Sequence, residues 1–487
     1  MTAQPNSNRV RTRFAPSPTG LLHIGGVRTA LFSYLLARHF GGDFVVRIED
    51  TDRERLVEGG VEQILESLAW LGLNPDEGPN TSKQPYGPYI QSERKQQGVY
   101  EKFAQQLVAE GKAYYSAITP EDFANLKAQA IAEKKPFVYR QSMEPPAPSE
   151  TKGLPIRLKI APGTVNWQDA VHGEFNVNHD IIEDFIIMKA DGFPMYNFAN
   201  VIDDHVMKIS HVVRGPEFLA STPKHALLYD YFGWDRPIFA HCPTILGPDG
   251  KKKLSKRDGD VDALEYRNNG FLPAAVLNFL ALLGWNDGST QEIFSLDELT
   301  KKFSLDRIQK SPAQFDAERL KWMNGEYIRN VLSEQEYLTI AKRALAQAKY
   351  DLGGHADDYV DRVLLLDRER VKIFSEVPDL VAFFFVPPEW NAEQRQLLTA
   401  KSDASEITTW LSAAVEVLKN TDGSEEAIEQ ALRGLSEQGD IHTGKLFYAV
   451  RIAITGRAAA PGLFETIAVL GISESAHRLK SAVDLLS

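Results

Sequence analysis

Residues 13–26 read RFAPSPTGLLHIGG, a stretch in which a strand ends, a Gly/Pro loop follows and a helix begins. The first N–H groups of such a helix have no partner within it and carry the positive end of its dipole, which makes this turn a phosphate site. Gly25 and Gly26 have no Cβ to keep a nucleotide away from the backbone. His23 stands just before the helix, where an imidazole could donate to a phosphate oxygen as charge develops. Taken alone, an H-x-G-G stretch is more often an ordinary helix cap.

A second basic stretch lies far along the chain, where residues 247–260 read GPDGKKKLSKRDGD. Four of its side chains can face phosphate, namely Lys253, Ser255, Lys256 and Arg257. Glycines on both sides give the loop freedom to close, and its charge could neutralise a triphosphate. Taken alone, such a run is equally typical of a nucleic-acid contact or of solvated surface.

Together and in this order, the two stretches resemble the HIGH and KMSKS signatures of the class I aminoacyl-tRNA synthetases. The glutamyl enzymes of that class are the most similar, because further matching stretches follow in sequence: RIEDTD at 47–52, GPYIQSER at 87–94, YNFANVIDDH at 196–205 and WMNGEYI at 322–328. The resemblance covers essentially the whole chain and is strongest up to about Asn330. The first signature ends in Gly26 instead of a second His, so that position can act on phosphate only through its backbone.

The resemblance implies a ligase that activates L-glutamate with ATP to glutamyl-adenylate and transfers glutamate to the 3′ end of tRNA(Glu), discriminating against tRNA(Gln). Both steps spread negative charge over phosphate oxygens, so positioned cations and N–H donors matter more than a general base. We expect His23, Lys253 and Lys256 to be catalytic and Mg²⁺ to accompany the ATP. The whole ATP site is expected to comprise Pro16, Gly20, His23, Gly25, Gly26, Lys253, Ser255, Lys256 and Arg257.

The anionic side chain of the substrate requires a cation with directional geometry, and the planar fork of arginine matches a carboxylate. Arg13 and Arg214 both follow predicted strands, and both match positions that hold glutamate in the family. Glu49 would take the ammonium group of the substrate. The remaining residues expected at the glutamate site are Ala15, Ser17, Tyr196 and Asn200.

Other charged residues near these motifs have simpler interpretations. We expect Arg47 and Arg53 to form surface ion pairs with the acidic residues of 49–52. The run Asp203-Asp204-His205 looks metal-binding in isolation, but adjacent aspartates on a helix cannot both face one ion. Capping and packing are therefore favoured, and no metal site is predicted in the protein.

The composition is that of a multidomain globular protein, since 487 residues exceed what one hydrophobic core usually organises. No run of about 18 apolar residues occurs, and the polar start lacks the apolar core of a signal peptide. The only cysteine, Cys242, excludes an intrachain disulfide and suits a reducing compartment, so we expect a cytoplasmic protein. The net charge of −12 argues against non-specific coating of nucleic acid, but local basic faces can still bind tRNA.

The order of segments favours an α/β fold, with a Rossmann-type nucleotide-binding core split by an α/β insertion. The first half is predicted as a β-α-β unit with a strand at 10–13, a helix at 26–40, a strand at 43–48 and a helix at 60–71. The insertion is predicted to contain a helix at 93–110 and a half-exposed strand at 156–160. The second half is predicted to return with 185–188, a helix at 196–205, a strand at 209–214, a helix at 222–232 and a strand at 239–241.

By resemblance, the chain is expected to have six parts: the core at 1–100, an acceptor-stem-binding insertion at 101–195, the core again at 196–246, a linking stem-contact domain with the lysine loop at 247–333, and two all-α anticodon-binding domains at 334–392 and 393–487. Some glutamyl enzymes carry zinc-binding cysteines in the segment that matches 113–118. This segment has none, so we expect no zinc. We expect a monomer that binds tRNA(Glu), L-glutamate and ATP and no membrane.

Arg370 aligns with a family position where arginine favours the glutamate anticodon, although it could instead pair with Asp367 or Glu369. Two other functions fit part of the pattern. A nucleotidyltransferase of the same superfamily would share the His23 turn but has no use for the helical appendage. A catalytically inactive tRNA-binding paralogue would keep the appendage and lose the phosphate residues, which are present here.

Overall fold

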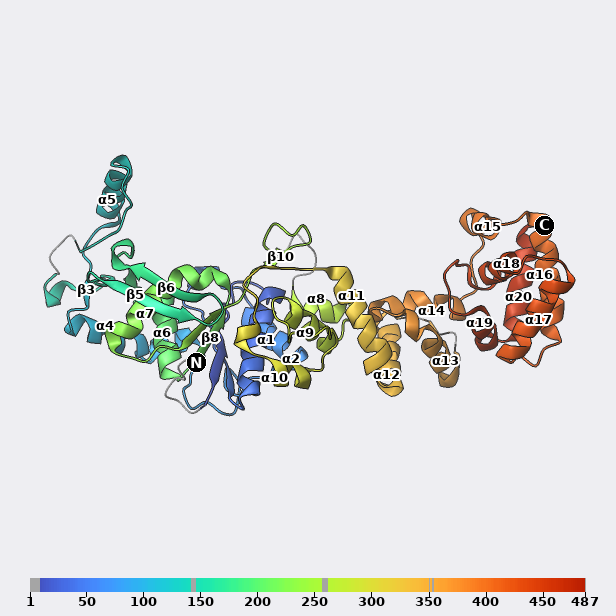
Figure 1. Cartoon of the computed structure of the whole chain (residues 1–487), viewed down its shortest axis with the longest axis horizontal. Coiled ribbons are helices and arrows are strands. Elements are labelled where there is room, and N and C mark those ends of the chain that lie inside the picture. The colour runs from blue at the N-terminus through green and yellow to red at the C-terminus, as the bar shows by residue number, and fades with distance from the viewer. Residues whose placement is uncertain (1–8, 142–145, 256–261, 350, 353, 487) are drawn as a thin grey trace. The chain divides into compact units, whose positions relative to one another are not determined.

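The computed structural model describes residues 9–486 except 142–145, 256–261, 350 and 353 (Figure 1). The chain divides into two compact units, the first made of Met1–Arg267 and Pro273–Ala317 and the second of Asn268–Leu272 and Glu318–Ser487. The first unit mixes helices and strands, and the described part of the second is built of helices. The predicted combination of an α/β core with a following all-α region is therefore confirmed.

A six-stranded sheet in the order β2-β1-β8-β9-β5-β6 organises the first unit. Its four core strands are parallel: β1 (Arg11–Phe14), β2 (Asp43–Val46), β8 (His211–Arg214) and β9 (Ile238–His241). An antiparallel hairpin of β5 (Thr164–Asp169) and β6 (Gly173–Asn178) extends the sheet, with β5 parallel to β9. The carboxyl ends of β1, β8 and β9 therefore meet at one edge, where open α/β sheets bind ligands.

Helices complete the predicted β-α-β arrangement around this sheet. The main ones are α1 (Ile24–His39), α2 (Gly60–Trp70), α6 (Tyr196–Val206) and α7 (Thr222–Phe232). Helix α1 connects β1 to β2, and α7 connects β8 to β9. The chain leaves α7 at Gly233, whose φ of 69° lies in the left-handed region that favours glycine.

Three sequence predictions between residues 93 and 188 are wrong in detail. The predicted helix 93–110 is two helices, α3 (Gln91–Gln96) and α4 (Val99–Ala109), because Gly98 between them has a φ of 71°. The predicted half-exposed strand is β4 (Ile156–Leu158), which is fully buried. Residues 185–188 do not return to the core sheet, since β7 (Ile186–Met188) joins β4 and β3 (Ala113–Tyr115) in a separate three-stranded sheet.

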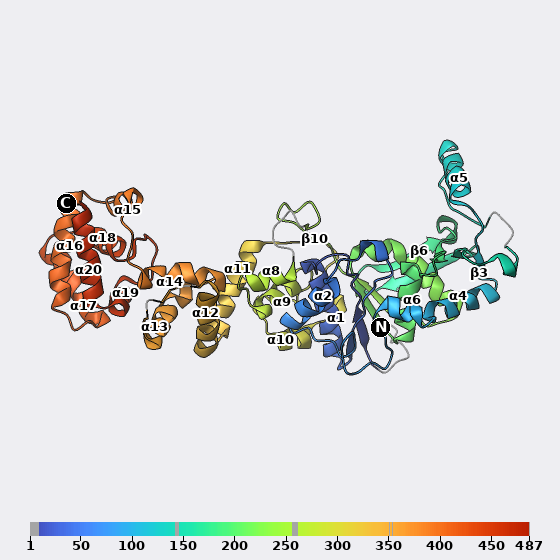
Figure 2. The same ribbon diagram turned by 180° about the vertical axis from the view of Figure 1, so that it is seen from behind.

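The rest of the first unit surrounds these two sheets. Helix α5 (Pro120–Ala132) buries none of its residues and projects from the insertion in both ribbon views (Figures 1 and 2). Strands β10 (Ile245–Leu246) and β11 (Ala313–Gln314) pair in parallel, and the chain between them carries the helices α8 (Ala263–Asn268), α9 (Pro273–Leu282) and α10 (Leu296–Lys302).

Ten helices account for most of the described second unit. They are α11 (Ala317–Glu326), α12 (Glu334–Gln347), α13 (Asp357–Asp367), α14 (Val377–Phe385), α15 (Ala392–Leu398), α16 (Ala404–Lys419), α17 (Glu425–Gln438), α18 (Thr443–Thr455), α19 (Leu463–Leu470) and α20 (Ile472–Leu486). Amphipathic spacing explains their packing, since α16 buries Ile407, Leu411, Ala414, Val415 and Leu418 along one face. Among the residues described, no helix of either unit is long and apolar enough to cross a membrane.

Candidate active site

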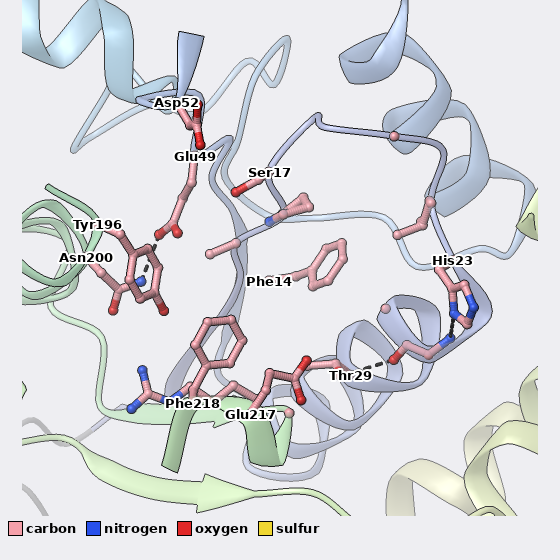
Figure 3. Close-up of a pocket in the computed structure, with 18 of the residues that line it drawn as sticks. Phe14, Ser17, His23, Thr29, Glu49, Asp52, Tyr196, Asn200, Glu217 and Phe218 are labelled. Atoms are coloured by element: carbon pink, nitrogen blue, oxygen red, sulfur yellow. Dashed lines mark hydrogen bonds between the residues drawn. The ribbon is translucent and has the colours of Figure 1, made fainter. Parts of the chain in front are cut away.

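A cavity of about 1180 Å³ opens at the carboxyl ends of β1 and β8, within the first unit. Most of the predicted site residues line it: Arg13, Ala15, Pro16, Ser17, Gly20, His23, Gly25, Gly26, Glu49, Tyr196, Asn200, Arg214, Lys253 and Ser255. In Figure 3, His23 lies at one end of the pocket and Glu49, Tyr196 and Asn200 at the other. The predicted residues Lys256 and Arg257 lie outside the described part of the chain, and Arg370 lies in the second unit.

The end of the pocket that was predicted to bind phosphate is the first turn of α1. His23 caps this helix, because its Nδ1 accepts a hydrogen bond of 3.0 Å from the backbone N–H of Gly25 (Figure 3). The capping interpretation is therefore confirmed, and it is compatible with a role towards the ligand, since an accepting Nδ1 places the proton of a neutral ring on Nε2. A Cβ at Gly26 would lie 3.0 Å from a methyl group of Leu22, so the close packing of this turn favours glycine.

Lys253, in the described part of the lysine loop, lines the same pocket. Its ammonium group lies 3.4 Å from a carboxylate oxygen of Glu217, and both side chains are at least half exposed. Glu217 belongs to the short 3₁₀ segment Pro216–Ser221 that follows β8. Because an exposed ion pair of this kind contributes little free energy, Lys253 can exchange Glu217 for a phosphate at small cost.

Arg214 is a buried cation at the end of the pocket that lies opposite His23. Its guanidinium donates to three uncharged acceptors, His241 Nε2 at 3.0 Å, Thr222 Oγ1 at 2.9 Å and His225 Nδ1 at 3.2 Å. Among the described residues, no carboxylate oxygen lies within 4.0 Å of it. Burial lowers the pKa of Arg214, as expected for a cation removed from water. A ligand carboxylate would supply the missing negative charge.

Arg13, the second arginine predicted to hold the substrate carboxylate, already has a charged partner. Its Nε lies 3.1 Å and 3.2 Å from the two carboxylate oxygens of Asp204 on α6. Arg13 also lines the cavity, so it can contribute its positive field to a bound anion. Of the two arginines, Arg214 therefore has the stronger electrostatic demand for a ligand carboxylate.

The interpretation of Arg47 as a surface residue is wrong. The Arg47 side chain is completely buried and pairs with Glu49 at 2.9 Å and Asp204 at 2.7 Å. Arg53, in contrast, is 55% exposed and pairs with Asp50 at 3.3 Å, which confirms the prediction of a surface ion pair. The local sequence did not distinguish Arg47 from Arg53, because Arg47 is buried against a partner, Asp204, that is 157 residues away in the chain.

The adjacent aspartates of α6 serve packing, as predicted. Asp203 accepts hydrogen bonds from Arg94, Gln91 and Tyr100, with donor-to-oxygen distances of 2.6, 2.8 and 2.9 Å. Asp204 faces the arginines of β1 and of the segment after β2. Within the described ranges, no three His, Cys, Asp or Glu side chains are grouped so that they could hold a metal ion.

Glu49 and Tyr196 give the pocket its remaining polarity. Glu49 Oε1 accepts from Asn200 at 2.8 Å (Figure 3). The same oxygen accepts from Arg47 at 2.9 Å. Burial raises the pKa of Glu49, and the positive charge of Arg47 opposes this effect. A second cation bound beside Glu49 would act as Arg47 does and favour the ionised carboxylate. Burial also raises the pKa of Tyr196 to about 12, which keeps its hydroxyl a neutral donor.

Comparisons with known proteins match both the catalytic and the helical parts of the chain. Residues 9–322 match the family model described as tRNA synthetases class I (E and Q), catalytic domain, and residues 336–483 match the model of an anticodon binding domain. The glutamate–tRNA ligase of Chloroflexus aurantiacus is 45% identical over 98% of both chains. The chain belongs to the glutamate–tRNA ligase family of class I synthetases. The family's enzyme from Clostridium botulinum is 41% identical over 99% of both chains.

A solved structure supports the same family over the full fold. The crystal structure of a glutamate tRNA ligase from Elizabethkingia meningosepticum, in complex with its amino acid, superimposes with a TM-score of 0.89. It is 36% identical in sequence and covers 98% of this chain and 100% of that chain. The fold expected of a glutamate–tRNA ligase is thus present in both units.

Several cavity residues were not predicted from the sequence. Glu217 and Phe218 come from the 3₁₀ segment after β8, while Arg28 and Thr29 come from the second turn of α1. The Gly215-Pro216 pair after a buried strand was the available signal, because open α/β sheets bind ligands at loops that follow the carboxyl ends of their strands.

Proposed function

We propose that the chain is a glutamate–tRNA ligase that activates L-glutamate with ATP and transfers it to the 3′ end of tRNA(Glu). The observation that carries the proposal is the pocket that joins a phosphate-binding helix turn at His23 to a buried arginine, Arg214, with only uncharged partners. The geometry suits a substrate with a phosphate group at one end and a carboxylate at the other. Membership of the glutamate–tRNA ligase family supports the same reaction.

In the first step, the α-carboxylate of glutamate attacks the α-phosphorus of ATP and pyrophosphate leaves. The N–H groups at the start of α1 and His23 Nε2 would stabilise the charge that develops on the phosphates, together with Lys253. We assign the same task to Lys256, and Ser255 and Arg257 would shape the loop. Mg²⁺ would accompany the triphosphate and neutralise part of its charge.

Charged side chains of the pocket would recognise the bound glutamate. Arg214 and Arg13 would bind the side-chain carboxylate, Glu49 the ammonium group, and the Tyr196 hydroxyl would add a neutral hydrogen bond. Remaining polar or close contacts would come from Ser17, Asn200 and the backbone of Ala15. Glutamine would be rejected, because its amide N–H groups would oppose guanidinium donors and leave polar groups unpaired, at a cost of about 1–3 kcal/mol each.

We also assign tRNA contacts to the parts of the chain outside the catalytic core. The insertion at 101–195 would bind the acceptor end of tRNA, the segment 247–333 would contact its stem, and the helical parts 334–392 and 393–487 would bind the anticodon. The catalytic core would comprise 1–100 and 196–246. We further propose a cytoplasmic monomer without zinc.

The decisive experiment is aminoacylation of purified tRNA(Glu) and tRNA(Gln), side by side, with glutamate and with glutamine. We expect charging with glutamate only and a preference for tRNA(Glu). Comparable charging with free glutamine would overturn the specificity assigned to Arg214. ATP–pyrophosphate exchange with glutamate should depend on tRNA, as the family resemblance implies. An inactive paralogue would give no exchange under any condition, and a nucleotidyltransferase would not form the aminoacyl ester.

A further inference from the structure

Arg214 is hydrogen-bonded to buried side chains that do not line the cavity. His241, at the end of β9, presents Nε2 to Arg214 Nε at 3.0 Å and Nδ1 to the carboxylate of Asp169 at 2.5 Å. Asp169, at the end of β5, is itself completely buried, as is His241. Three strands of the central sheet therefore bring Asp169, His241 and Arg214 into one hydrogen-bonded line.

The hydrogen bonds in this line fix the tautomer of the imidazole. A carboxylate accepts only, so His241 must donate from Nδ1 to Asp169. Its Nε2 then carries a lone pair, which is what the N–H donor of Arg214 requires. Burial lowers the pKa of His241, against the pull of Asp169, so the ring stays neutral and keeps this acceptor at neutral pH.

Asp169 is held in place independently of the imidazole. Its Oδ1 accepts backbone N–H bonds of 3.0 Å from both Val171 and His172, in the turn that joins β5 to β6. The bond from His241 and these backbone bonds lower the pKa of Asp169 although burial opposes them, so the carboxylate is ionised. Its negative charge is one imidazole ring away from the guanidinium.

This spacing has a consequence for substrate binding. A carboxylate in direct contact with Arg214 would occupy its donors and repel the carboxylate of the substrate. With His241 between them, Asp169 offsets part of the buried positive charge while the guanidinium remains able to bind an anion. His225 supports the same orientation from the other side, because its Nδ1 faces Arg214 at 3.2 Å and its Nε2 faces Asn197 Oδ1 at 2.9 Å.

We propose that Asp169 and His241 form a positioning dyad that orients the Arg214 guanidinium towards the side-chain carboxylate of glutamate and thereby sets the affinity and selectivity for this amino acid. The proposal rests on the function proposed above, in which Arg214 binds that carboxylate. Neither residue of the dyad is assigned contact with the substrate. Both residues act by fixing the direction of the Arg214 Nε–H bond, and Asp169 also acts through its negative charge near the guanidinium.

The first test is Asp169→Asn in the full chain, assayed by aminoacylation of tRNA(Glu). An asparagine amide can donate to His241 Nδ1, which moves the ring proton to Nε2 and sets it against the Arg214 N–H. We expect the KM for glutamate to rise by about tenfold to a hundredfold, the scale of a lost hydrogen bond to a charged group. The KM for ATP should stay within about twofold of wild type, since the phosphate end is not involved.

A matched control separates positioning from general stability. Asp184 is also a buried carboxylate that accepts two backbone N–H bonds, from Gln141 and Ile160, but it lies just before β7 of the separate three-stranded sheet and accepts from Tyr114 instead of a pocket residue. Asp184→Asn should leave the KM for glutamate unchanged. If both variants lower the melting temperature alike and neither changes that KM, Asp169 is only structural and the proposal fails.

Substitutions at His241 test the role of its acceptor. His241→Gln retains a carbonyl oxygen that can accept from Arg214, whereas His241→Leu removes every acceptor while keeping an apolar bulk. We expect the Gln variant to recover much of the glutamate affinity that the Leu variant loses. Equal KM values for the two would overturn the proposal.

Arg214→Lys separates failure of the dyad from failure of the proposed function, in which Arg214 binds the side-chain carboxylate of glutamate. A rise in the KM for glutamate in Arg214→Lys, with none in Asp169→Asn, would reject the dyad and leave the glutamate site intact. An unchanged KM in Arg214→Lys would reject the glutamate site itself. A rise in both, together with weaker discrimination between glutamate and glutamine, is the expected result.

Discussion

Asp204 joins Arg13 and Arg47, because its Oδ1 lies 3.1 Å from Arg13 Nε and 2.7 Å from Arg47 Nη1. One carboxylate from α6 thus fixes an arginine of the proposed glutamate site and an arginine that is buried completely beneath it. Arg47 extends the connection to Glu49, the residue proposed to hold the substrate ammonium group. The charges of the pocket are therefore set by a network that continues into the core.

Asp204→Asn is expected to destabilise the protein strongly. Removing one charge from this network leaves Arg13 and Arg47 buried with less compensation, and breaking a buried ion pair costs about 3–5 kcal/mol. Urea denaturation of the full chain, followed by tryptophan fluorescence, measures the change. Asp52→Asn is the control, since Asp52 is 44% exposed and pairs with an exposed arginine. Similar midpoints for the two variants would show that the Asp204 network is not needed for stability.

Local periodicity and glycine positions were sufficient to predict much of the core. The predicted helix 222–232 is α7 itself, because a proline near its start and Gly233 at its end mark both limits. The helix predicted at 93–110 failed at Gly98, since a single glycine inside a helical pattern does not reveal whether its φ is positive. Residues 185–188 were placed in the wrong sheet because apolar strands of different sheets look alike in sequence.

The candidate site was predictable where one continuous motif carries it, as in the turn from Arg13 to Gly26. The network behind it was not. Asp169, His241 and Arg214 come from three strands, and no sequence spacing relates them. The burial of Arg47 also depends on long-range contacts, so the sequence alone could show its charge but not its environment.

Lys253→Ala and Lys256→Ala are expected to lower kcat by about a hundredfold to a thousandfold while tRNA affinity changes little. The reason is that these charges would act mainly as the phosphates rearrange, and one lost transition-state donor has effects on this scale. Single-turnover aminoacylation and a filter-binding measurement of tRNA provide the two readouts. Lys251→Ala, at an exposed position of the same loop, is the control. Near-normal turnover in the first two variants would make the loop merely a basic surface.

Elemental analysis of the purified chain should find no stoichiometric zinc. Thiolate ligands are the usual basis of a structural zinc site, and Cys242 is the only cysteine. It is also completely buried beside the pocket, where burial raises the pKa of the thiol to about 11. One tightly held zinc per chain would contradict this prediction.

Stability should depend on pH through Asp367. Burial, which exceeds the opposing effect of the Arg370 charge, raises the pKa of Asp367 from 3.8 to about 6. The folded protein therefore binds a proton between about pH 4 and pH 6 that the unfolded chain releases, so this contribution to stability falls as the pH rises through that window. Asp367→Asn should remove it. Denaturation midpoints measured across this window for both proteins test the sign, and parallel curves would contradict it.

Arg370 forms an ion pair with Asp367 and donates to the Ala459 carbonyl at 3.3 Å. The pairing that a purely structural role would need is therefore present, while 28% of the side chain remains exposed for a ligand. If Arg370 contacts the third anticodon base, Arg370→Gln should narrow the preference for tRNA(Glu) over tRNA(Gln). A bidentate arginine–base contact contributes about 1–3 kcal/mol, so we expect a change of about tenfold to a hundredfold in the ratio of kcat/KM values.

Charging of both tRNAs by the wild type and by Arg370→Gln decides between recognition and structure. Glutamate activation, measured by pyrophosphate exchange with saturating tRNA(Glu), should be unchanged, because the pocket lies within the first unit and Arg370 in the second. Arg362→Gln is the matched control, since Arg362 is a 55% exposed arginine that pairs only loosely, at 4.0 Å, with Asp358. An unaltered tRNA ratio with a lower melting temperature would assign Arg370 to the packing of Asp367 alone. Equal charging of both tRNAs by the wild type would instead make the enzyme non-discriminating, and the anticodon contact would have nothing to explain.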